Sequence, residues 1–452
     1  MNIVIIGDGK VGSTLSSQLQ KEGHDIVVID NNQNALKNLI NAQDVMCVEG
    51  NGALYTVQEE AGVSKADLMV ACTSMDELNM LCCLLAKKLG AKKTIARVRD
   101  PQYFKQLNFM KDELGLSMGV NPELAAAAEI ARIIIFPAAT KIELFSKGRV
   151  ELVEFKLSKE SVLDGMSLFE LYKKYKVKVL VCAVQREGEV YIPNGEFRLK
   201  SGDKINLSAS HENIERFFKA IGIMKNQSTS AMIVGGGRVA YYLTQALQEL
   251  GIKVKIIEQD YHRCMELSDL LPRASIIHGD GTDQSLLKEE GLAQVDAFAS
   301  LTGIDEENII MAMFATSCNV PKVAAKVNRD SYANMADMLG LESIVSPKNI
   351  TANHIVSYVR AMQNSFGSNI ETLYQLVDNQ VEALEFAVRE DGDYIGVPLK
   401  QLKLKKNLLI ASIVRKRNCI IPGGDDHIEI GDNVIVVCRN QRFKDLKEIL
   451  QG

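Results

Sequence analysis

Residues 3–12 read IVIIGDGKVG, an apolar run followed by a glycine-rich segment. The run predicts a buried parallel strand, and the glycines predict a tight turn into a helix. In this pattern Gly7 permits the turn, Gly9 leaves bare backbone for a pyrophosphate, and Gly12 lets the helix pack closely. The N–H groups at the start of a helix attract phosphates. We therefore predict a dinucleotide-binding unit here.

An acidic residue follows the glycines at the distance that this interpretation requires. Asp30 ends the second expected strand, 25–29, where a carboxylate accepts hydrogen bonds from the ribose hydroxyls of a bound nucleotide. The same carboxylate repels a 2′-phosphate. The sequence thus favours NAD(H), or another adenine nucleotide such as ATP or ADP, over NADP(H).

The pattern occurs twice in the chain. Residues 231–240 read AMIVGGGRVA, and Glu258 follows them as Asp30 follows Gly7. The segment 50–52 (GNG) returns as 279–281 (GDG), in register with the rest of the second half. The chain is therefore an internal duplication. Because Ala240 replaces the third glycine, and because duplicated domains can lose a ligand while keeping the fold, the second site can be empty.

Apolar strands alternate with helical stretches in each half. Strands are expected at 2–6, 25–29, 44–48, 67–72 and 94–98, with a sixth near 117–121. This alternation predicts α/β architecture: two Rossmann-like doubly wound parallel-sheet domains in tandem, each followed by a small α+β subdomain. The expected boundaries are 1–140, 141–224, 229–365 and 370–452, with a polar linker at 224–230. In the first small subdomain we expect strands at 151–157, 177–185 and 204–208 and a helix at 167–174.

Two apolar helices, at 124–136 and 350–362, leave two interpretations open: they cover their own sheets, or they pack between subunits.

Ligands of such sheets lie beyond the carboxyl ends of the strands, which defines the candidate site. Thr73 and Arg97 could contact phosphate or ribose. Alternatively, Thr73 caps a helix and Arg97 forms a salt bridge with Asp100. The candidate cofactor-binding residues are Gly7, Asp8, Gly9, Lys10, Val11, Gly12, Asp30, Asn31, Asn51, Gly52, Thr73, Ser74, Arg97 and Val98 in the first half, and Gly235, Gly236, Gly237, Arg238, Val239, Glu258, Asp280, Gly281, Thr302 and Lys326 in the second.

Composition excludes several classes of protein. A net charge of −5 without a basic block argues against a nucleic-acid partner. Nine scattered cysteines without a C-x-x-C pair predict buried thiols in a reducing compartment and no metal site. The N-terminus does not resemble a signal peptide, and there is no long uninterrupted apolar run, so we expect a cytoplasmic protein without a membrane span.

The sequence shows no catalytic constellation. His24, His211 and His278 each occur in one half only, and His278 stands where the first half has Glu49. A general base would need supporting polar neighbours close to the cofactor. We therefore expect a ligand sensor and not an enzyme. An NAD-dependent oxidoreductase of a small molecule remains the alternative, on fold analogy alone.

These glycine loops, acids, GNG/GDG turns and duplicated strands resemble RCK (KTN) domains, and the small units resemble their C-terminal subdomains. The resemblance implies a nucleotide-sensing regulatory subunit, peripheral to the inner face of the cell membrane, that assembles as a homo-oligomeric ring, dimer or tetramer. It further implies a Trk-type membrane potassium-translocating subunit as partner, gated when NAD(H), ATP or ADP binds at the same sites. A second ligand in the small subdomains, such as a cyclic dinucleotide, is a third alternative.

Overall fold

The computed structural model describes residues 1–135, 139–158, 160–223, 228–339, 341, 343–364, 370–377, 380–439, 441, 443 and 445–451. Part of the predicted linker, 224–227, and the predicted domain ends at 224, 365 and 452 lie outside these residues. The chain divides into two compact units. Unit 1 comprises Met1–Ala131 and Thr229–Val359, and unit 2 comprises Arg132–Ser228 and Arg360–Gly452.

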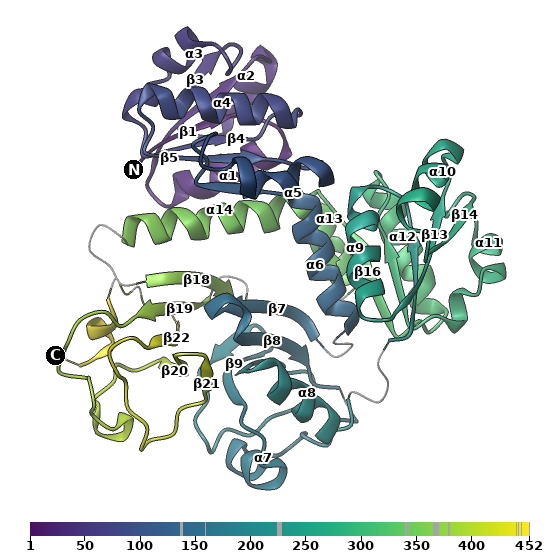
Figure 1. Cartoon of the computed structure of the whole chain (residues 1–452). Coiled ribbons are helices and arrows are strands. Elements are labelled where there is room, and N and C mark those ends of the chain that lie inside the picture. The colour runs from purple at the N-terminus through teal and green to yellow at the C-terminus, as the bar shows by residue number, and fades with distance from the viewer. Residues whose placement is uncertain are drawn as a thin grey trace. The chain divides into compact units, whose positions relative to one another are not determined.

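The first half of unit 1 is a six-stranded parallel sheet in the order β3-β2-β1-β4-β5-β6 (Figure 1). This is the strand order of the dinucleotide-binding fold. Its strands are β1 (Asn2–Ile6), β2 (Asp25–Asp30), β3 (Met46–Glu49), β4 (Leu68–Ala71), β5 (Lys93–Arg97) and β6 (Met118–Val120), and its helices are α1 (Lys10–Lys21), α2 (Gln33–Ala42), α3 (Tyr55–Glu60), α4 (Asp76–Leu89), α5 (Pro101–Met110) and α6 (Pro122–Ile135), with the 3-10 turn η1 (Val63–Lys65).

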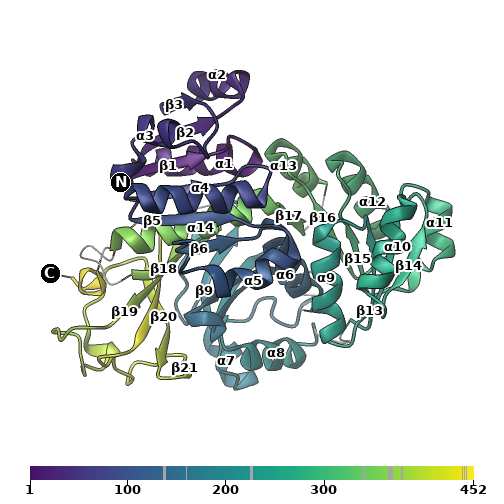
Figure 2. The same cartoon turned by 45° about the horizontal axis from the view of Figure 1, so that its top comes forward.

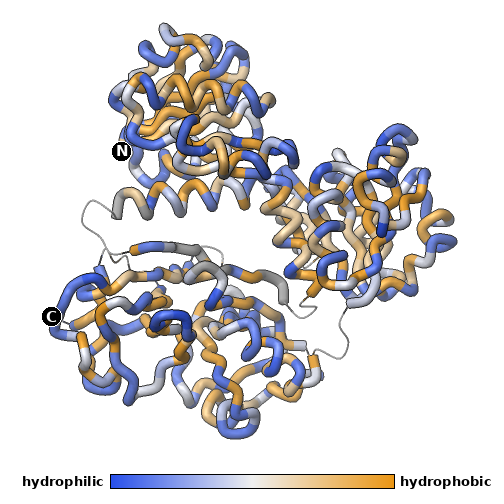
Figure 3. The backbone as a smooth tube through the Cα atoms, viewed as in Figure 1, coloured by the Kyte–Doolittle hydropathy of each residue, from blue (hydrophilic) through white to orange (hydrophobic). Residues whose placement is uncertain are grey.

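Helices on both faces bury this sheet, which explains why its strands are apolar throughout. Side chains alternate between faces along a strand. Val4 and Ile6 of β1 join the core beneath α4, whereas Ile3 and Ile5 point to the other face, and all four are almost fully buried. In Figure 3 the tube is largely orange, the colour of hydrophobic residues, along the strands inside this domain. The doubly wound parallel sheet expected from the sequence is confirmed.

The second half of unit 1 repeats this architecture with the strand order β14-β13-β12-β15-β16-β17 (Figure 2). Its strands are β12 (Ser230–Val234), β13 (Lys253–Glu258), β14 (Ser275–His278), β15 (Ala297–Ser300), β16 (Lys322–Lys326) and β17 (Ile344–Val345), and its helices are α9 (Arg238–Glu249), α10 (Tyr261–Leu270), α11 (Gln284–Glu289), α12 (Asp305–Ser317), α13 (Asp330–Met338) and α14 (Pro347–Asn364), with η3 (Leu292–Gln294).

Two expected strands begin later than their apolar runs do. Strand β3 starts at Met46 and not at 44, because Gln43 ends α2 with its N–H bonded to the Leu39 carbonyl. Strand β9 starts at Leu180 and not at 177, because Lys176 takes a left-handed conformation (φ 51°) at the end of the preceding helix. In both places a helix ends directly before the expected strand, and the chain joins the sheet only two or three residues further on.

Unit 2 contains two five-stranded antiparallel sheets with the same topology, β10-β9-β11-β8-β7 and β18-β19-β22-β20-β21. The α+β subdomains expected from the sequence are confirmed, although strands β7 and β10 of the first subdomain were not anticipated. The first comprises β7 (Ala139–Phe145), β8 (Val150–Lys156), β9 (Leu180–Arg186), β10 (Glu189–Tyr191), β11 (Lys204–Ala209), η2 (Ser146–Gly148), α7 (Leu168–Tyr175) and α8 (His211–Ala220), and the second β18 (Ile370–Leu376), β19 (Val381–Ala387), β20 (Leu408–Arg415), β21 (Asn418–Ile420), β22 (Asn433–Arg439), η4 (Leu399–Gln401) and η5 (Leu446–Ile449).

The two sheets of unit 2 share one apolar core, to which Leu152 and Cys182 of the first contribute beside Val381 and Val437 of the second. A buried carboxylate also joins the sheets. Glu385, 1% exposed, accepts hydrogen bonds from the Ser146 backbone N–H (3.2 Å) and hydroxyl (2.5 Å). The two small subdomains therefore form one folded body.

No helix among the described residues is both long and apolar enough to cross a bilayer.

We predict that Glu385→Gln destabilises unit 2 by about 1–3 kcal/mol, because an amide N–H₂ would face the donors of Ser146 in a buried position. Chemical denaturation measures the effect, and Glu160→Gln, at an exposed position, is the control. Equal midpoints for the two variants would show that this buried contact contributes no stability.

Candidate functional site

The first glycine loop connects β1 to α1 and is held by two close backbone approaches. Gly7 has a φ of 100°, and a Cβ there would lie 2.9 Å from the Thr73 backbone nitrogen. A Cβ on Gly12 would lie 1.9 Å from the Gly7 carbonyl oxygen. Both glycines are thus required by packing within the protein.

Gly9 differs from the other two glycines of the loop, Gly7 and Gly12. It is exposed, and a Cβ there would meet no protein atom within 4 Å. Gly9 is also the N-cap residue of α1 and supplies no side-chain cap to the helix. The loop therefore presents open space directly at a helix N-terminus, as bound phosphate requires.

Asp30 is fixed by the loop that it faces. Its Oδ2 accepts a hydrogen bond from the Asp8 backbone N–H (2.6 Å), and its Oδ1 accepts one from the Asn32 N–H (2.8 Å). A carboxylate oxygen has further lone pairs, so the ribose hydroxyls of a ligand could still bind. The side chain of Asp8 lies close by. Burial, and then the charge of Asp30, raise the pKa of Asp8 to about 6.

The second half reproduces this geometry. Gly235 has a φ of 94°, Gly237 has open space where its Cβ would be, and Glu258 Oε2 accepts the Gly236 N–H at 2.5 Å. Ala240 is fully buried in α9, so a methyl group is accommodated at the third glycine position. The substitution that left the second site in doubt does not disrupt the loop.

The GNG and GDG turns lie beside the glycine loops. A Cβ on Gly52 would lie 2.3 Å from Ile6 Cγ2, and one on Gly281 would lie 2.1 Å from Val234 Cγ1. The side chains of Asn51 and Asp280 accept backbone N–H bonds within their own turns, from Ala53 and Thr282. These turns close tightly on the strand that leads into each glycine loop.

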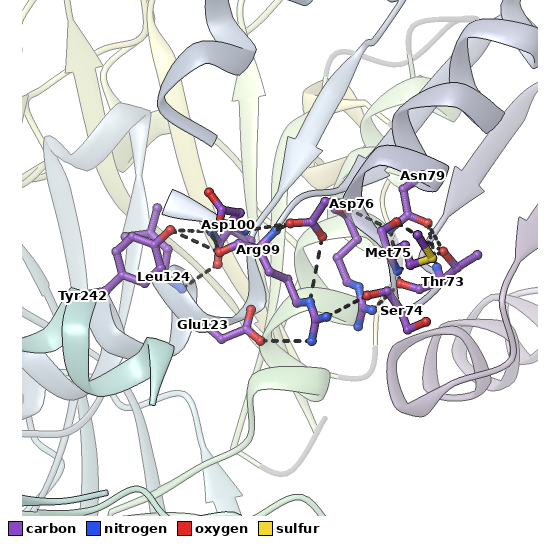
Figure 4. A network of polar contacts seen from close by, with 12 residues as sticks. Thr73, Ser74, Met75, Asp76, Asn79, Arg99, Asp100, Glu123, Leu124 and Tyr242 are labelled. Carbon is purple, nitrogen blue, oxygen red and sulfur yellow. Dashed lines mark hydrogen bonds and ion pairs between the residues drawn. The ribbon is translucent and has the colours of Figure 1, made fainter. Parts of the chain in front are cut away.

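Thr73 is held by a buried asparagine that the site prediction omitted (Figure 4). Asn79 of α4, 0% exposed, accepts hydrogen bonds at Oδ1 from the Thr73 N–H (2.8 Å) and hydroxyl (2.7 Å). Its Nδ2 donates to the carbonyl of Arg97 at 2.9 Å. Asn79 therefore joins the ends of β4 and β5. Thr73 does not cap α4, whose N-cap residue is Met75.

Arg97 turns toward this network as well. Its guanidinium donates to the Thr73 carbonyl, and burial lowers its pKa. The sequence left a salt bridge between Arg97 and Asp100 as the alternative. In the structure the side chain of Asp100 instead caps α5 by accepting hydrogen bonds from the N–H groups of Gln102 and Tyr103.

The contacts of Asn79 recur in the second half, whereas the basic residue beside them binds a different backbone carbonyl. Asn308 accepts the Thr302 N–H and hydroxyl, both at 2.9 Å, and donates to the Lys326 carbonyl. Lys326 donates to the Leu301 carbonyl at 3.0 Å. The sequence did signal these asparagines, since both halves carry one at the same place, but neither was assigned to the site.

The two halves of unit 1 meet beside this network. Asn121 donates to the hydroxyl of Tyr242 of α9 at 2.9 Å, and that hydroxyl donates to the Arg99 carbonyl at 3.4 Å. The guanidinium of Arg99 in turn donates to the Ser74 carbonyl and lies 3.8 Å from Glu123 (Figure 4). The first site is thereby connected to α9, the helix that begins at the second glycine loop.

The remaining candidates lie around the loops. Lys10, Asn31 and Arg238 are exposed, whereas Val11 and Val239 are buried in the first turns of α1 and α9. Val98 continues the sheet by donating its N–H to the Val120 carbonyl. In the described ranges, no three His, Cys, Asp or Glu side chains gather in a way that could hold a metal ion.

Fold and site together define a protein with two tandem Rossmann domains, each with a glycine loop open to an anionic ligand. Comparison with family models gives the TrkA-N domain at residues 3–122 and 231–347 and the TrkA-C domain at 152–222 and 383–451. The chain belongs to the TrkA family, and the resemblance to tandem RCK domains is confirmed.

Relatives cover nearly the whole chain. A "Trk system potassium uptake protein TrkA homolog 1" of Methanosarcina mazei is 34% identical, over 96% of this chain and 97% of its own length. A TrkA homolog of Archaeoglobus fulgidus is 32% identical over the full length of both chains. The TrkA protein of Haemophilus influenzae is 29% identical, over 98% of this chain and 96% of its own.

Solved structures share the fold. The GsuK RCK domain has a TM-score of 0.64 at 18% identity and covers 97% of this chain and 92% of its own. A GsuK channel bound to NAD has a TM-score of 0.65 at 18% identity, over 97% of this chain and 77% of its own.

We predict that Asn79→Ala lowers the free energy of unfolding by about 1–3 kcal/mol, because the buried Thr73 N–H loses its acceptor. Thermal unfolding measures this loss. Asn38→Ala, on the exposed side of α2, should leave the midpoint nearly unchanged. Equal midpoints for the two variants would contradict the structural role of Asn79.

Proposed function

We propose that this protein is a cytoplasmic, nucleotide-sensing regulatory subunit of a potassium uptake system, peripheral to the inner face of the cell membrane. The observation that carries the proposal is the duplicated glycine loop, in which Gly9 and Gly237 alone of each triplet face open space. Full-length relatives named Trk system potassium uptake proteins support the transport system. A GsuK channel of the same fold bound to NAD, and another bound to ADP, support the ligand class.

The proposed division of the chain is 1–140 and 229–365 for the nucleotide-binding domains, and 141–224 and 370–452 for the subdomains that follow. In each site the glycine loop would receive the pyrophosphate and the acid, Asp30 or Glu258, would bind the ribose. The GNG or GDG turn and the threonine turn would close the crevice. Since Arg97 and Lys326 contact backbone carbonyls, we assign them to hold these turns.

Regulation requires only that a nucleotide bind two shapes of the assembly unequally. The ligand then shifts the balance between them by the difference in binding free energy. We propose that the chains assemble as a homo-oligomeric ring, dimer or tetramer, on a Trk-type membrane subunit that conducts potassium, and that NAD(H), ATP or ADP changes its shape. No nucleic acid takes part.

An oxidoreductase is the weaker alternative, because its only support is the cofactor fold.

We predict that Gly9→Asp removes one of two nucleotide sites per chain and Gly237→Asp removes the other. Each added carboxylate would enter open space, so the fold should persist while the phosphates are repelled. Isothermal titration with NADH and ATP should give two sites for the wild type, one for each single variant and none for the double variant.

In vesicles that contain the membrane subunit, nucleotide should change the potassium flux with the wild-type chain and not with the double variant. Undiminished binding by the double variant would refute the sites. A flux insensitive to nucleotide, with binding intact, would refute the regulatory role.

We also predict that NAD binds the first site several-fold more tightly at pH 5.5 than at pH 7.5. Asp8 faces Asp30 of β2, Cys47 of β3 and Cys72, which directly follows β4, and its pKa is raised to about 6. Below that value Asp8 is protonated and one negative charge near the phosphates is removed; as the pH rises through 6 the charge returns and affinity falls. The pyrophosphate of NAD does not titrate in this range.

Titration of the Gly237→Asp chain at several pH values measures the effect. Asp8→Asn should bind NAD with little dependence on pH, and a retained dependence would show that another group is responsible.

A further inference from the structure

The two halves of unit 1 contact each other through the helices that follow their glycine loops. Tyr242 of α9 bonds to Asn121, which directly precedes α6, and Gln18 of α1 bonds to Asn353 of α14 at 3.3 Å. Because α6 and α14 each follow the sixth strand of their own half, the two contacts are related by the duplication. They differ in what they connect.

The Tyr242 contact leads into the first candidate site. Tyr242 is buried and is the fifth residue of α9, so its backbone lies about 6 Å along the helix axis from the second glycine loop. Its hydroxyl accepts a hydrogen bond from Asn121 Nδ2 at 2.9 Å and donates to the Arg99 carbonyl at 3.4 Å. The guanidinium of the same Arg99 donates to the Ser74 carbonyl at 2.8 Å (Figure 4). Helix α9 is therefore connected, through Arg99, to the turn that contains Thr73 and Ser74.

Among the described residues, the matching places in the opposite direction hold no such series of bonds. Thr14 is the fifth residue of α1, and its hydroxyl donates to the Lys10 carbonyl within its own helix at 2.8 Å. Ser346 directly precedes α14 as Asn121 precedes α6. The hydroxyl oxygen of Ser346 is buried and, in the part of the chain that the structure describes, has no hydrogen-bond partner.

Arg99 is also replaced in the second half. Asp76 accepts the Arg99 N–H at 2.8 Å, and Asp305 accepts the Asn328 N–H at 3.0 Å in the same way, so Asn328 takes the place of Arg99. The side-chain amide of Asn328 donates back to Asp305 at 3.2 Å instead of extending to the turn at Thr302. Within the described ranges the connection is thus one-sided, and it runs from α9 to the first site.

We propose that Tyr242 couples the two nucleotide sites, so that a nucleotide at the second glycine loop raises the affinity of the first site. This inference rests on the proposed function. A phosphate bound at the N-terminus of α9 would fix the position of that helix. A fixed Tyr242 would hold the backbone of Arg99, from which the guanidinium extends to Ser74. A turn that is already held costs less to order when its own ligand binds, so Tyr242 acts as a positioning residue.

The size of the effect is limited by the contact that carries it. The distance of 3.4 Å between the Tyr242 hydroxyl and the Arg99 carbonyl exceeds the usual range of about 2.5–3.0 Å for a hydroxyl donor, so this bond has room to strengthen. One hydrogen bond of ordinary net strength changes an equilibrium constant about two- to tenfold. We therefore expect the second nucleotide to raise the first-site affinity by about that factor.

The experiment measures this coupling factor with NADH on the full-length chain. Isothermal titration of Gly9→Asp gives the association constant of the second site alone, and titration of Gly237→Asp gives that of the first site alone. The overall constant for two NADH molecules on the wild type, divided by the product of these two constants, is the coupling factor. It should lie at about two to ten.

The same three titrations are repeated in chains that carry a further substitution. Tyr242→Phe removes the hydroxyl while the ring keeps its place, so the factor should fall to about one. Arg99→Met removes the donor to the turn and should lower the factor as well. Tyr241→Phe is the matched control, because its hydroxyl accepts a hydrogen bond from Gln245 of the same helix at 2.9 Å. That variant and Thr14→Val should leave the factor unchanged.

A factor of one or below in the wild type would overturn the inference while leaving the nucleotide sites of the proposed function in place. An undiminished factor in Tyr242→Phe would do the same, and an equal loss in Tyr241→Phe would show that the Tyr242 hydroxyl is not responsible. Absence of NADH binding by the wild type would instead refute the proposed function. Thermal unfolding establishes that each variant is folded, and Arg99→Met provides the test should Tyr242→Phe be unstable.

Discussion

The close approach of backbone to backbone at the two glycine loops determines what each site can do. Helix α1 can begin where it does only because Gly12 lies against the Gly7 carbonyl, and Gly7 can turn only because no Cβ meets the Thr73 nitrogen. These contacts place the N-terminus of α1 and the end of β4 around the same space. A backbone arrangement of the kind that binds phosphate in such folds therefore arises from packing before any side chain contributes. In the function that we propose, the polar residues have the separate role of selecting among ligands.

The sequence predicted the parts of the structure that depend on local pattern. Apolar strands buried on both faces leave a continuous signal, and a glycine between strand and helix has few alternatives, so both parallel sheets and both loops could be identified. Side-chain direction could not be identified in this way. Arg97 ends an expected strand beside the crevice, yet it turns to the Thr73 carbonyl because Asp100 is used as the cap of α5. Asn79 was seen as a repeated residue, but its long-range contacts follow only from the folded arrangement of β4, β5 and α4.

After the duplication, the two halves have kept the asparagine contacts but not the side chains around the acid that ends the second strand of each sheet. The asparagine that joins two strand ends makes the same contacts in both halves, since each contact satisfies a buried backbone group whose loss would be costly. Around the ribose acid, where side chains are exposed or half-buried, the halves differ in charge and in aromatic content. Exposed positions can change at little cost to stability. In the function that we propose, divergence concentrated there would change what a site binds without altering its fold.

The contact between the two halves of unit 1 links the two candidate sites. Tyr242 of α9 bonds to Asn121 and to the Arg99 carbonyl, and Arg99 reaches the carbonyl of Ser74 in the threonine turn of the first site. Helix α9 begins at the second glycine loop, so a ligand that shifts either loop acts on one shared set of hydrogen bonds. If both sites take nucleotides, as we propose, the contact would make binding at one depend on occupancy of the other, and linkage requires the dependence to be reciprocal.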